Sequence, residues 1–227
     1  MAVSFDIANA FNTFPWDAIL RALEHHGVPA YLRMVIRDYL RQREIVYMGR
    51  YRREVRAGVP QGSVLGPLLW NLGYDAVLRG VLPAGLELVC YADDTLVVAR
   101  GDDWASAARL SSVGASLVVE RIERLGLKVA LHKTEAVWLC QPRCRPPKLS
   151  LEIRGVRVEV GTTMKYLGLH LDSHWSFRAH FGHLAARLDR EVSSFRQLLP
   201  NLGGPGEECR RLYMAVVQSI ALYGAPV

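Results

Sequence analysis

Residues 86–99, Leu-Glu-Leu-Val-Cys-Tyr-Ala-Asp-Asp-Thr-Leu-Val-Val-Ala, place two adjacent carboxylates between two apolar runs. Residues 86–90 and the β-branched run 95–99 are typical of strands, and the short polar stretch between them predicts a tight hairpin. Asp suits turns, but this turn lacks the Asn-Gly or Asp-Gly pair that turn chemistry alone favours. A divalent cation, which prefers carboxylate oxygens on a rigid support, is the other explanation for Asp93 and Asp94. Either explanation fits the hairpin taken alone.

A third carboxylate strengthens the metal hypothesis. Residues 2–5, Ala-Val-Ser-Phe, are typical of a short strand that ends at Asp6. A strand-end Asp6 beside Asp93 and Asp94 could hold two Mg²⁺ ions about 3.5–4 Å apart, the arrangement of two-metal phosphoryl transfer. Three carboxylates at such distances repel one another, so without metal at least one is expected to have a raised pKa.

The stretch between these carboxylates contains an irregular loop. Residues 58–67, Gly-Val-Pro-Gln-Gly-Ser-Val-Leu-Gly-Pro, hold three glycines and two prolines. This composition is incompatible with a continuing strand or helix, and it lets a ligand approach the backbone closely.

Hydrophobic spacing and breaker residues predict the remaining elements. We expect helices at residues 15–26, 31–40, 67–82, 104–125, 177–199 and 207–223. We expect hairpins at residues 44–57 and 151–160, and single strands at 136–139 and 166–171. The strand at 136–139 can lie beside the carboxylate hairpin, and four strands with helices on one face would form a split βαβ unit.

The three motifs, in this order, resemble the palm motifs of reverse transcriptases. Residues 5–11, 58–66 and 91–94 resemble the first, second and third motif, and they are most similar to those of non-LTR (LINE-type) retrotransposons, especially the site-specific elements of arthropods. Further segments match a fourth palm motif (126–128 with 133–135), the primer-grip hairpin (Tyr166, Leu167 and Gly168) and a thumb segment (221–225). The resemblance therefore covers almost the whole chain.

The resemblance implies an α+β fold, a right-hand polymerase palm followed by a primer-grip hairpin and a helical thumb. The palm would be a split βαβ unit, an antiparallel sheet with helices on one face. We expect the palm at residues 1–140, a linker and the primer-grip region at 141–172, and a partial thumb at 173–227.

The resemblance also implies an RNA-directed DNA polymerase that extends a DNA 3′-hydroxyl on an RNA template with two Mg²⁺ ions, for which Mn²⁺ could substitute. One ion would lie between Asp6 and Asp93, and the other would bridge the deoxynucleoside triphosphate, Asp6 and the carbonyl of Ile7. Asp94 would be the weaker partner of the pair or simply a carboxylate that supports the turn. The partners would be an RNA template, a DNA primer or target, and deoxynucleotides.

Four more residues receive roles from the resemblance. Phe11 would exclude nucleotides that carry a 2′-hydroxyl. The alternative is that Phe11 is only an aromatic residue of the core. Gln61 and Gly62 would contact the incoming nucleotide and its template partner. Lys133 would donate a proton to the pyrophosphate leaving group, although a single lysine is as often merely solvated.

The charge distribution suits a nucleic-acid partner. The net charge is +6, and residues 143–211 hold twelve Lys/Arg against seven Asp/Glu. We expect Arg187, Arg190 and Arg196 in the thumb to contact nucleic acid. A second cluster comprises Arg41, Arg43, Arg50, Arg52, Arg53 and Arg56. A solvated face is the alternative for both clusters, but their position beside a polymerase site favours nucleic-acid contact.

Other features limit the class of protein. No apolar run is long enough to cross a bilayer, and four cysteines without framework spacing favour a reducing compartment. The resemblance places the protein inside the cell, in the nucleus at the site of integration. A zinc site from Cys140, Cys144 and nearby histidines is conceivable, but the spacings match no common zinc pattern, and His180 and His183 fit the polar face of a helix.

One departure from the family affects the expected activity. Reverse transcriptases carry basic fingers before the first motif, whereas only five residues precede Asp6 here. We therefore expect an incomplete fragment that binds nucleic acid and polymerises poorly. The alternative is a non-catalytic, nucleic-acid-binding remnant of such an element. Another palm-type nucleotidyl enzyme, such as a cyclase, would not explain residues 60–62 or 166–168.

Overall fold

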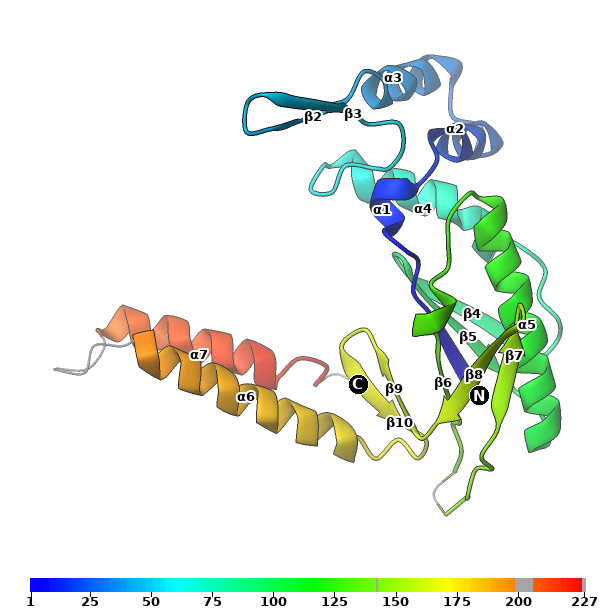
Figure 1. The fold of residues 1–227 in the computed structure, drawn as a ribbon, viewed down its shortest axis with the longest axis vertical. Coiled ribbons are helices and arrows are strands. Elements are labelled where there is room, and N and C mark those ends of the chain that lie inside the picture. Colours follow the sequence, from blue (N-terminus) through cyan, green and yellow to red (C-terminus); the bar gives the residue numbers. More distant parts are fainter. Residues whose placement is uncertain (142, 199–205, 226–227) are drawn as a thin grey trace. The chain divides into compact units, whose positions relative to one another are not determined.

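The structure is a computed structural model that describes residues 1–141, 143–198 and 206–225 (Figure 1). The chain forms two compact units. The first contains residues 1–138 and 143–161, and the second contains the described residues of 139–142 and 162–227. The boundaries expected at residues 140 and 172 separate regions by function, as palm, primer grip and thumb. The division into compact units does not test them, so they stay predictions.

A six-stranded sheet forms the centre of the first unit. Its order is β4 (Leu86–Tyr91), β5 (Asp94–Ala99), β1 (Ala2–Phe5), β6 (Glu135–Val137), β8 (Val156–Gly161) and β7 (Ser150–Ile153). All neighbours are antiparallel except β6 and β8. The α+β class is therefore confirmed, but the expected sheet of four strands is too small. The hairpin at residues 150–161 extends it, and β1 separates β6 from the carboxylate hairpin.

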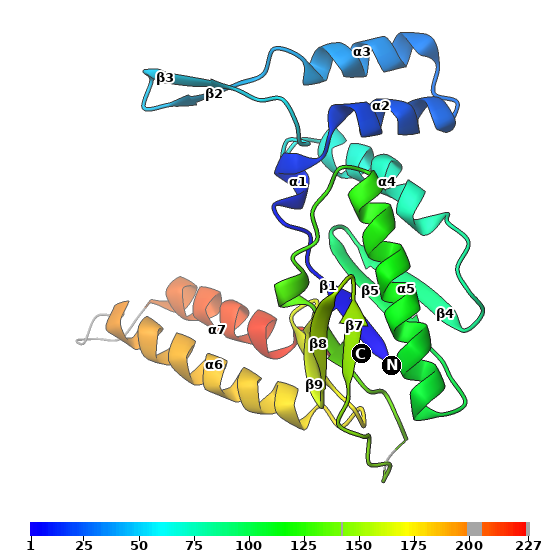
Figure 2. The same cartoon turned by 45° about the vertical axis from the view of Figure 1, so that its right-hand side comes forward.

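Helix α5 (Trp104–Arg124) packs along the sheet (Figure 2). Its buried residues include Ala108, Ser111, Ala115, Val118 and Ile122, whose spacing of three and four residues forms one face of a helix. Asp103 caps the helix, because its carboxylate accepts a hydrogen bond from the Ser106 amide at 2.6 Å. The apolar stripe thus holds the helix against the carboxylate-bearing strands.

Helix α4 (Leu65–Leu78) begins two residues before the expected position and ends four residues before it. The Ser63 hydroxyl accepts a hydrogen bond from the Gly66 amide at 2.9 Å, which satisfies an amide of the first turn. Pro67 is tolerated there because its missing N–H would have had no helical partner. The Gly-rich loop is therefore shorter than the sequence predicts.

The other elements of the first unit include four that the sequence predicts, α2 (Trp16–His25), α3 (Ala30–Leu40), β2 (Glu44–Tyr47) and β3 (Tyr51–Glu54). They also include two short helices that it does not predict, α1 (Ala10–Thr13) and the 3₁₀ helix η1 (Leu131–Lys133). The helices expected at 15–26 and 31–40 and the hairpin expected at 44–57 are confirmed, with ends that differ by at most three residues.

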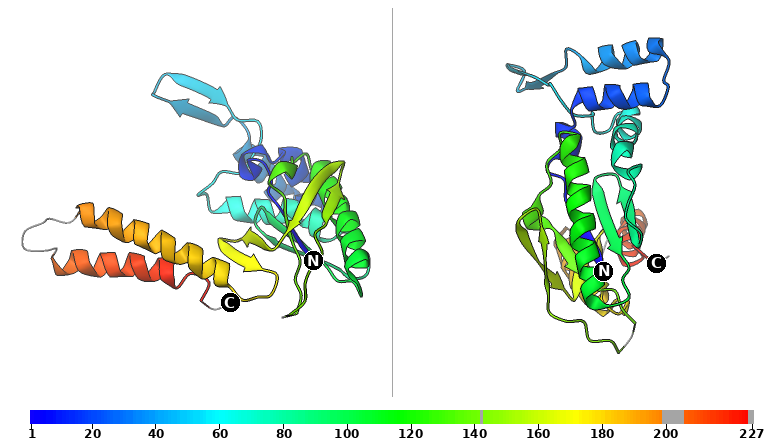
Figure 3. Two further views of the ribbon diagram at one scale, coloured as in Figure 1. Left: turned by 60° about the horizontal axis from the view of Figure 1, so that its bottom comes forward. Right: turned by 90° about the vertical axis from the view of Figure 1, so that its right-hand side faces the viewer.

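The second unit contains the hairpin β9 (Thr163–Tyr166) and β10 (Leu169–Asp172), followed by α6 (Arg178–Leu198) and α7 (Glu207–Ala221). The single strand expected at 166–171 is wrong, because Leu167 and Gly168 take φ angles of 47° and 80° and reverse the chain. Helices α6 and α7 lie side by side (Figure 3), with the rings of Phe195 and Tyr213 packed edge to face at 5.1 Å. None of the helices in the described residues is long and apolar enough to span a membrane.

Candidate active site

The register of β1 and β5 brings the first and third sequence motifs together. Phe5 lies opposite Thr95, so Asp6 follows β1 at the same end at which Asp94 begins β5. Asp93 belongs to the two-residue turn between β4 and β5. In that turn Ala92 has a φ angle of 53°, a strained conformation for a residue with a Cβ. The register therefore brings Asp6, which is distant in sequence, to the same end of the sheet as the adjacent Asp93 and Asp94.

The backbone around Asp6 holds the fourth motif beside the first. The Asp6 carbonyl accepts a hydrogen bond from the Ala130 amide, and the Ala8 amide donates to the Lys128 carbonyl, each at 2.8 Å. These bonds place η1 next to the carboxylates. Lys133, at the end of η1, donates from Nζ to Asp6 Oδ2 at 2.7 Å. The sequence did not predict this ion pair, which joins residues 127 positions apart.

The electrostatics of the carboxylates match the expectation of mutual repulsion. Burial raises the pKa of Asp94 above its ordinary value, and the charges of Asp93 and Asp6 raise it further. Asp6 is therefore close enough to influence Asp94 although β1 and β5 are distant in sequence. Their catalytic roles remain predictions.

The donor set suits a hard divalent cation, because it consists of carboxylate oxygens at strand ends. Within the described residues, however, no three His, Cys, Asp or Glu side chains are grouped closely enough to hold a metal ion. One oxygen of Asp6 instead binds the ammonium group of Lys133. The chain thus supplies suitable ligands, of which one is partly neutralised by an internal cation.

The second motif is fastened directly to the first. The Gly58 amide donates to the Phe14 carbonyl and the Val59 amide donates to the Phe11 carbonyl, both at 2.7 Å. Gly58 has a φ angle of 91°, and a Cβ there would lie only 2.7 Å from the Phe11 carbonyl oxygen. No other residue type fits this close approach. Gln61 and Gly62 follow on the exposed part of the loop.

Phe11 packs in a way that fits both of its proposed interpretations. Its half-buried ring stacks on Trp70, with 4.7 Å between the ring centroids. This contact explains Phe11 as part of the core, while its partial exposure leaves an edge available to a ligand. Its role as a gate stays a prediction.

A buried hydrogen bond beneath the carboxylate hairpin was not predicted. The Tyr74 hydroxyl of α4 lies 2.7 Å from the Thr95 hydroxyl, one residue after Asp94. Burial raises the pKa of Tyr74, so its phenol stays protonated. The spacing of Tyr74 with Trp70 and Val77 on the buried face of α4 is the sequence signal that could have identified it.

In the second unit, two segments that resemble family motifs contact each other. The Tyr223 hydroxyl donates to the Leu167 carbonyl at 2.6 Å, and a Cβ on Gly168 would lie 3.0 Å from the Tyr223 ring. Tyr166 ends β9 immediately before this turn. The turn expected to grip a primer is therefore held by the segment that follows α7.

The expected nucleic-acid contacts and the zinc alternative concern α6. Arg187 and Arg190 are exposed on this helix, whereas the side chain of Arg196 lies outside the described residues. His180 is 8% exposed and therefore buried, so its expected place on a polar face is wrong. Its ring lies 6.4 Å from that of His170, but the described histidines and cysteines include no group of three that could bind zinc.

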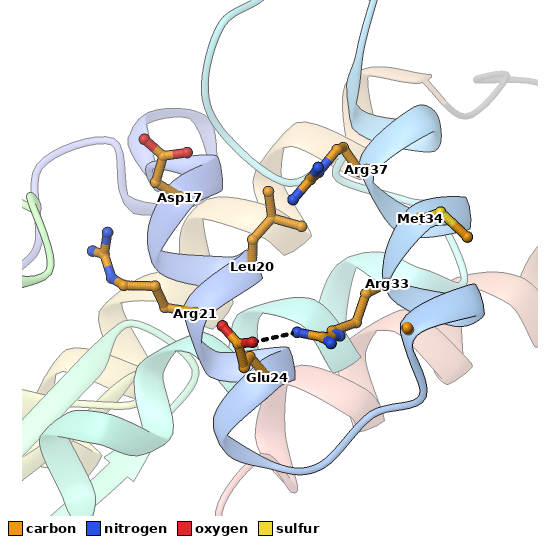
Figure 4. A pocket seen from close by; sticks show the side chains of 8 residues that line it. Asp17, Leu20, Arg21, Glu24, Arg33, Met34 and Arg37 are labelled. Atoms are coloured by element: carbon orange, nitrogen blue, oxygen red, sulfur yellow. Dashed lines mark hydrogen bonds and ion pairs between the residues drawn. The ribbon is translucent and has the colours of Figure 1, made fainter.

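A separate pocket lies between α2 and α3 (Figure 4). Its lining residues are Asp17, Leu20, Arg21, Glu24, Ala30, Arg33, Met34 and Arg37. Arg33 reaches across it to Glu24 at 2.7 Å. None of the candidate catalytic residues lines this pocket, so its presence does not bear on the carboxylate site.

Known proteins similar to the chain point to one family. The family described as reverse transcriptase (RNA-dependent DNA polymerase) matches residues 1–171. A Pol polyprotein from the type-1 retrotransposable element R1 of Bradysia coprophila is 25% identical over 100% of this chain and 23% of its own length. The RNA-directed DNA polymerase from the mobile element jockey of Drosophila melanogaster is 24% identical over 98% of this chain and 25% of its own length. The chain spans about a quarter of these curated relatives.

Solved structures with a similar fold include telomerases. Apo telomerase of Candida tropicalis, truncated from its C-terminal domain, matches 76% of this chain and 34% of its own, with a TM-score of 0.52 and 13% identity. The same enzyme with a fragment of telomeric RNA matches 86% of this chain and 34% of its own, with a TM-score of 0.50 and 12% identity. At this identity the likeness concerns the fold alone, and it agrees with a polymerase palm and thumb.

Proposed function

Because the chain belongs to the reverse transcriptase (RNA-dependent DNA polymerase) family, as its motifs predicted, we propose that it is the polymerase domain of a non-LTR retrotransposon enzyme. It would add deoxynucleotides to a DNA 3′-hydroxyl on an RNA template. The observation that carries this proposal is the placement of Asp6 with Asp93 and Asp94 at one end of β1 and β5, where burial and the charges of Asp93 and Asp6 raise the pKa of Asp94.

Asp6 and Asp93 are the residues that would hold two Mg²⁺ ions, with Asp94 as a supporting carboxylate and Mn²⁺ as a substitute. When bound, the ions lower the pKa of the primer hydroxyl and neutralise charge on the triphosphate. The family resemblance implies the Ile7 carbonyl as a further ligand, and this carbonyl accepts no backbone hydrogen bond from the described residues.

Lys133 is proposed to donate a proton to the pyrophosphate leaving group. Its ion pair with Asp6 holds the ammonium group beside the carboxylates before substrate binds. An incoming triphosphate, which carries several negative charges, would compete with Asp6 for this ammonium group. Asp6 would thus hold Lys133 in position until its ammonium group binds the triphosphate.

The loop and the first helix would shape the nucleotide pocket. Gln61 and Gly62 are exposed on a loop whose start is hydrogen-bonded to the Phe11 carbonyl. We propose that they contact the nucleotide pair, while the Phe11 ring excludes a 2′-hydroxyl. Phe11→Val should then relax discrimination against ribonucleotides, whereas unchanged discrimination would make Phe11 a core residue only.

The remaining assignments concern partners and location. Tyr166, Leu167 and Gly168 would contact the DNA primer, and Arg187, Arg190 and Arg196 would contact the primer–template backbone. We expect the protein to act in the nucleus at the site of integration. Neutralising the three arginines should weaken binding and reduce its salt slope by about one unit for each phosphate group that is no longer bound.

A second candidate is a non-catalytic nucleic-acid-binding function. It is favoured by the pairing of Asp6 with Lys133, and by the lack of a three-ligand metal group among the described residues. In this alternative the carboxylates would be a remnant of the family's site, and only the basic surfaces would act.

Extension of a DNA primer on an RNA template, in the presence and absence of Mg²⁺, separates the two candidates. The polymerase proposal predicts weak but Mg²⁺-dependent extension, in keeping with the poor polymerisation expected above. Asp93→Asn should reduce it to background, because metal ligation contributes several kcal/mol to the transition state. A chain that folds and binds the primer–template but extends it no better than Asp93→Asn would favour the binding function.

A further inference from the structure

The β2–β3 hairpin extends away from the central sheet of the first unit (Figure 1). All eight residues of its two strands are exposed, including Ile45, Val46, Tyr47 and Tyr51 at 54–68%. A two-stranded hairpin is only marginally stable by itself in water, and a cluster of exposed apolar residues marks an interaction surface. The composition of the hairpin therefore points to a binding partner.

The strand register divides the hairpin into two different faces. Tyr47 lies opposite Tyr51 and Ile45 lies opposite Arg53, and because side chains alternate along a strand these four residues share one face. We call these four residues the tyrosine face. The opposite face carries Glu44 with Glu54, and Val46 with Arg52.

The charges of the two faces differ. On the opposite face, Arg52 pairs with Glu44 at 3.2 Å, and Arg56 pairs with Glu54 at 2.8 Å. The tyrosine face contains no carboxylate, and its Arg53 forms no ion pair with any described residue. One face is thus internally neutralised, whereas the other presents two aromatic rings and an uncompensated positive charge.

The tyrosine face continues toward the second sequence motif. Arg43 and Val55 are the next residues on the same face, since the Val55 amide donates to the Arg43 carbonyl at 2.8 Å. Arg43, Ile45 and Val55 line a hollow together with Glu44 of the opposite face, Asn12 and the segment 57–60. Arg43 also lies over the Tyr39 ring, 5.4 Å from its centroid. The face therefore leads to the loop that precedes Gln61.

We propose that the tyrosine face binds single-stranded nucleic acid, with Tyr47 and Tyr51 stacked on bases and Arg53 bound to phosphate. Bases of any sequence stack on aromatic side chains, and an unpaired guanidinium attracts a polyanion. A duplex keeps its base faces stacked within itself and offers the tyrosines nothing comparable. The inference deepens the proposed function, on which it rests, by naming where the unpaired part of a template would lie.

Photocrosslinking with a single-stranded oligonucleotide that carries 5-iodouracil tests the proposal directly on the full chain. We expect crosslinks at Tyr47 and Tyr51. Tyr47→Ala and Tyr51→Ala should each weaken binding of the single strand about tenfold, as expected for the loss of one stacked base. Tyr47→Phe and Tyr51→Phe should retain binding, because the ring and not the hydroxyl makes the contact.

Matched control variants test whether binding requires the tyrosine face itself or only a positive charge or a tyrosine elsewhere on the surface. Arg53→Ala should lower the salt slope of binding by about one unit, whereas Arg52→Ala, which removes the same charge from the opposite face, should leave it unchanged. Tyr31, 69% exposed on α3, is the aromatic control, and Tyr31→Ala should have no effect. All variants should keep the circular dichroism spectrum of the parent chain.

Three results would overturn the inference: crosslinks confined to residues outside the hairpin, equal losses in Arg52→Ala and Arg53→Ala, or tyrosine-dependent self-association in place of oligonucleotide binding. The binding assay contains neither Mg²⁺ nor nucleotide, so it is independent of catalysis. If the tyrosine variants bind the oligonucleotide normally while primer extension remains dependent on Asp93, only the proposed role of the tyrosine face is refuted. Failure of extension with intact stacking refutes only the polymerase proposal.

Discussion

Asp94 and Asp172 are both carboxylates at the end of a strand, but their surroundings are opposite in kind. Asp94 begins β5 among carboxylates, and burial together with the charges of Asp93 and Asp6 raises its pKa. Asp172 ends β10 in the second unit. Burial acts to raise its pKa as well, but hydrogen bonds from the amides of Ser176, His174 and Phe177 lower it below the ordinary value. The carboxylate oxygens of Asp172 also accept a bond from the Ser176 hydroxyl at 3.1 Å.

In its ionised form Asp172 stabilises the fold, whereas ionised Asp94 destabilises it. The ionised form of Asp172 organises the turn before α6, because its two oxygens accept hydrogen bonds from the amides of His174, Ser176 and Phe177. The ionised form of Asp94 faces like charges and gains nothing comparable. A group retained at an electrostatic cost is a candidate for function. This argument assigns Asp94 to the site and Asp172 to the scaffold without reference to the family.

The largest expected effect tests the functional side of the comparison. Asp94→Asn should lower primer extension about a hundredfold, the effect of removing one group that stabilises charge in a transition state. The same substitution should leave the melting temperature unchanged or raise it, because it removes repulsion from Asp93. Asp172→Asn serves as the control and should leave extension per folded molecule unchanged. Loss of folding in Asp94→Asn would contradict the comparison.

The next effect concerns the structural side. Asp172→Ala should lower the free energy of unfolding by about 2 kcal/mol, because it removes the charged acceptor before α6. Its folded pKa is lowered, so its stabilisation is present above the ordinary Asp pKa of about 3.9 and is lost as the pH falls through the folded value. For Asp94 the pH dependence of stability has the opposite sign. Ionisation of Asp94 destabilises the fold, and this destabilisation develops as the pH rises from about 3.9 through the raised pKa of Asp94.

Urea unfolding of the parent chain, Asp172→Ala and Asp94→Asn between about pH 3 and pH 7 measures both signs. The stability difference between the parent chain and Asp172→Ala should shrink toward zero at the acid end. If Asp172→Ala is as stable as the parent chain at neutral pH, the hydrogen bonds to Asp172 do not have the structural role that we assign to them.

A smaller effect sharpens the account of the carboxylate site. Lys133→Ala should increase the affinity of the chain for Mn²⁺ by up to about fivefold, because an exposed ion pair contributes about 0–1 kcal/mol and no longer competes for Asp6. Lys128→Ala removes the same charge from the segment whose carbonyl binds the Ala8 amide, and it is the control. Calorimetric titration measures these affinities. If both variants bind Mn²⁺ with the affinity of the parent chain, Lys133 does not compete with the metal ion for Asp6.

The smallest expected effect lies in the second unit. Tyr223→Phe removes the hydroxyl that donates to the Leu167 carbonyl, and this should cost less than about 1 kcal/mol at an exposed position. Hydrogen exchange at the β9–β10 turn should nevertheless become faster. Tyr213→Phe, in which the ring contact with Phe195 is retained, should leave exchange at that turn unaltered. Equal exchange in both variants would show that the hydroxyl does not hold the turn.

The sequence predicted the parts of the site that depend on local pattern. The run 86–99 encodes a hairpin because its two halves are apolar and β-branched, and Asp6 could be placed at a strand end for the same reason. The order of the motifs then predicted the family. Helix α5 was predicted within one residue because its apolar spacing is long and is interrupted at Gly126.

The parts that failed depend on contacts between distant residues or on unusual turns. Nothing in residues 135–161 indicates that β6 pairs with β8 in parallel and extends the sheet. A Leu-Gly pair is an uncommon two-residue turn, since Asn or Asp usually precedes the glycine, so the local pattern wrongly predicted one strand at 166–171. The family resemblance, in contrast, had placed a hairpin at Tyr166, Leu167 and Gly168, as the structure shows. The pair of Lys133 and Asp6 depends on the bridge between residues 7 and 129, which has no local signature.

The carboxyl pKa values of Asp94 and Asp172, measured by ¹³C NMR titration with and without Mg²⁺, test the central claim most directly. We predict that Asp94 titrates above the ordinary value of about 3.9, that Asp172 titrates below it, and that Mg²⁺ lowers the pKa of Asp94 while leaving Asp172 unchanged. An Asp94 that titrates at or below the ordinary value, or whose pKa does not respond to Mg²⁺, would contradict a metal-binding carboxylate site.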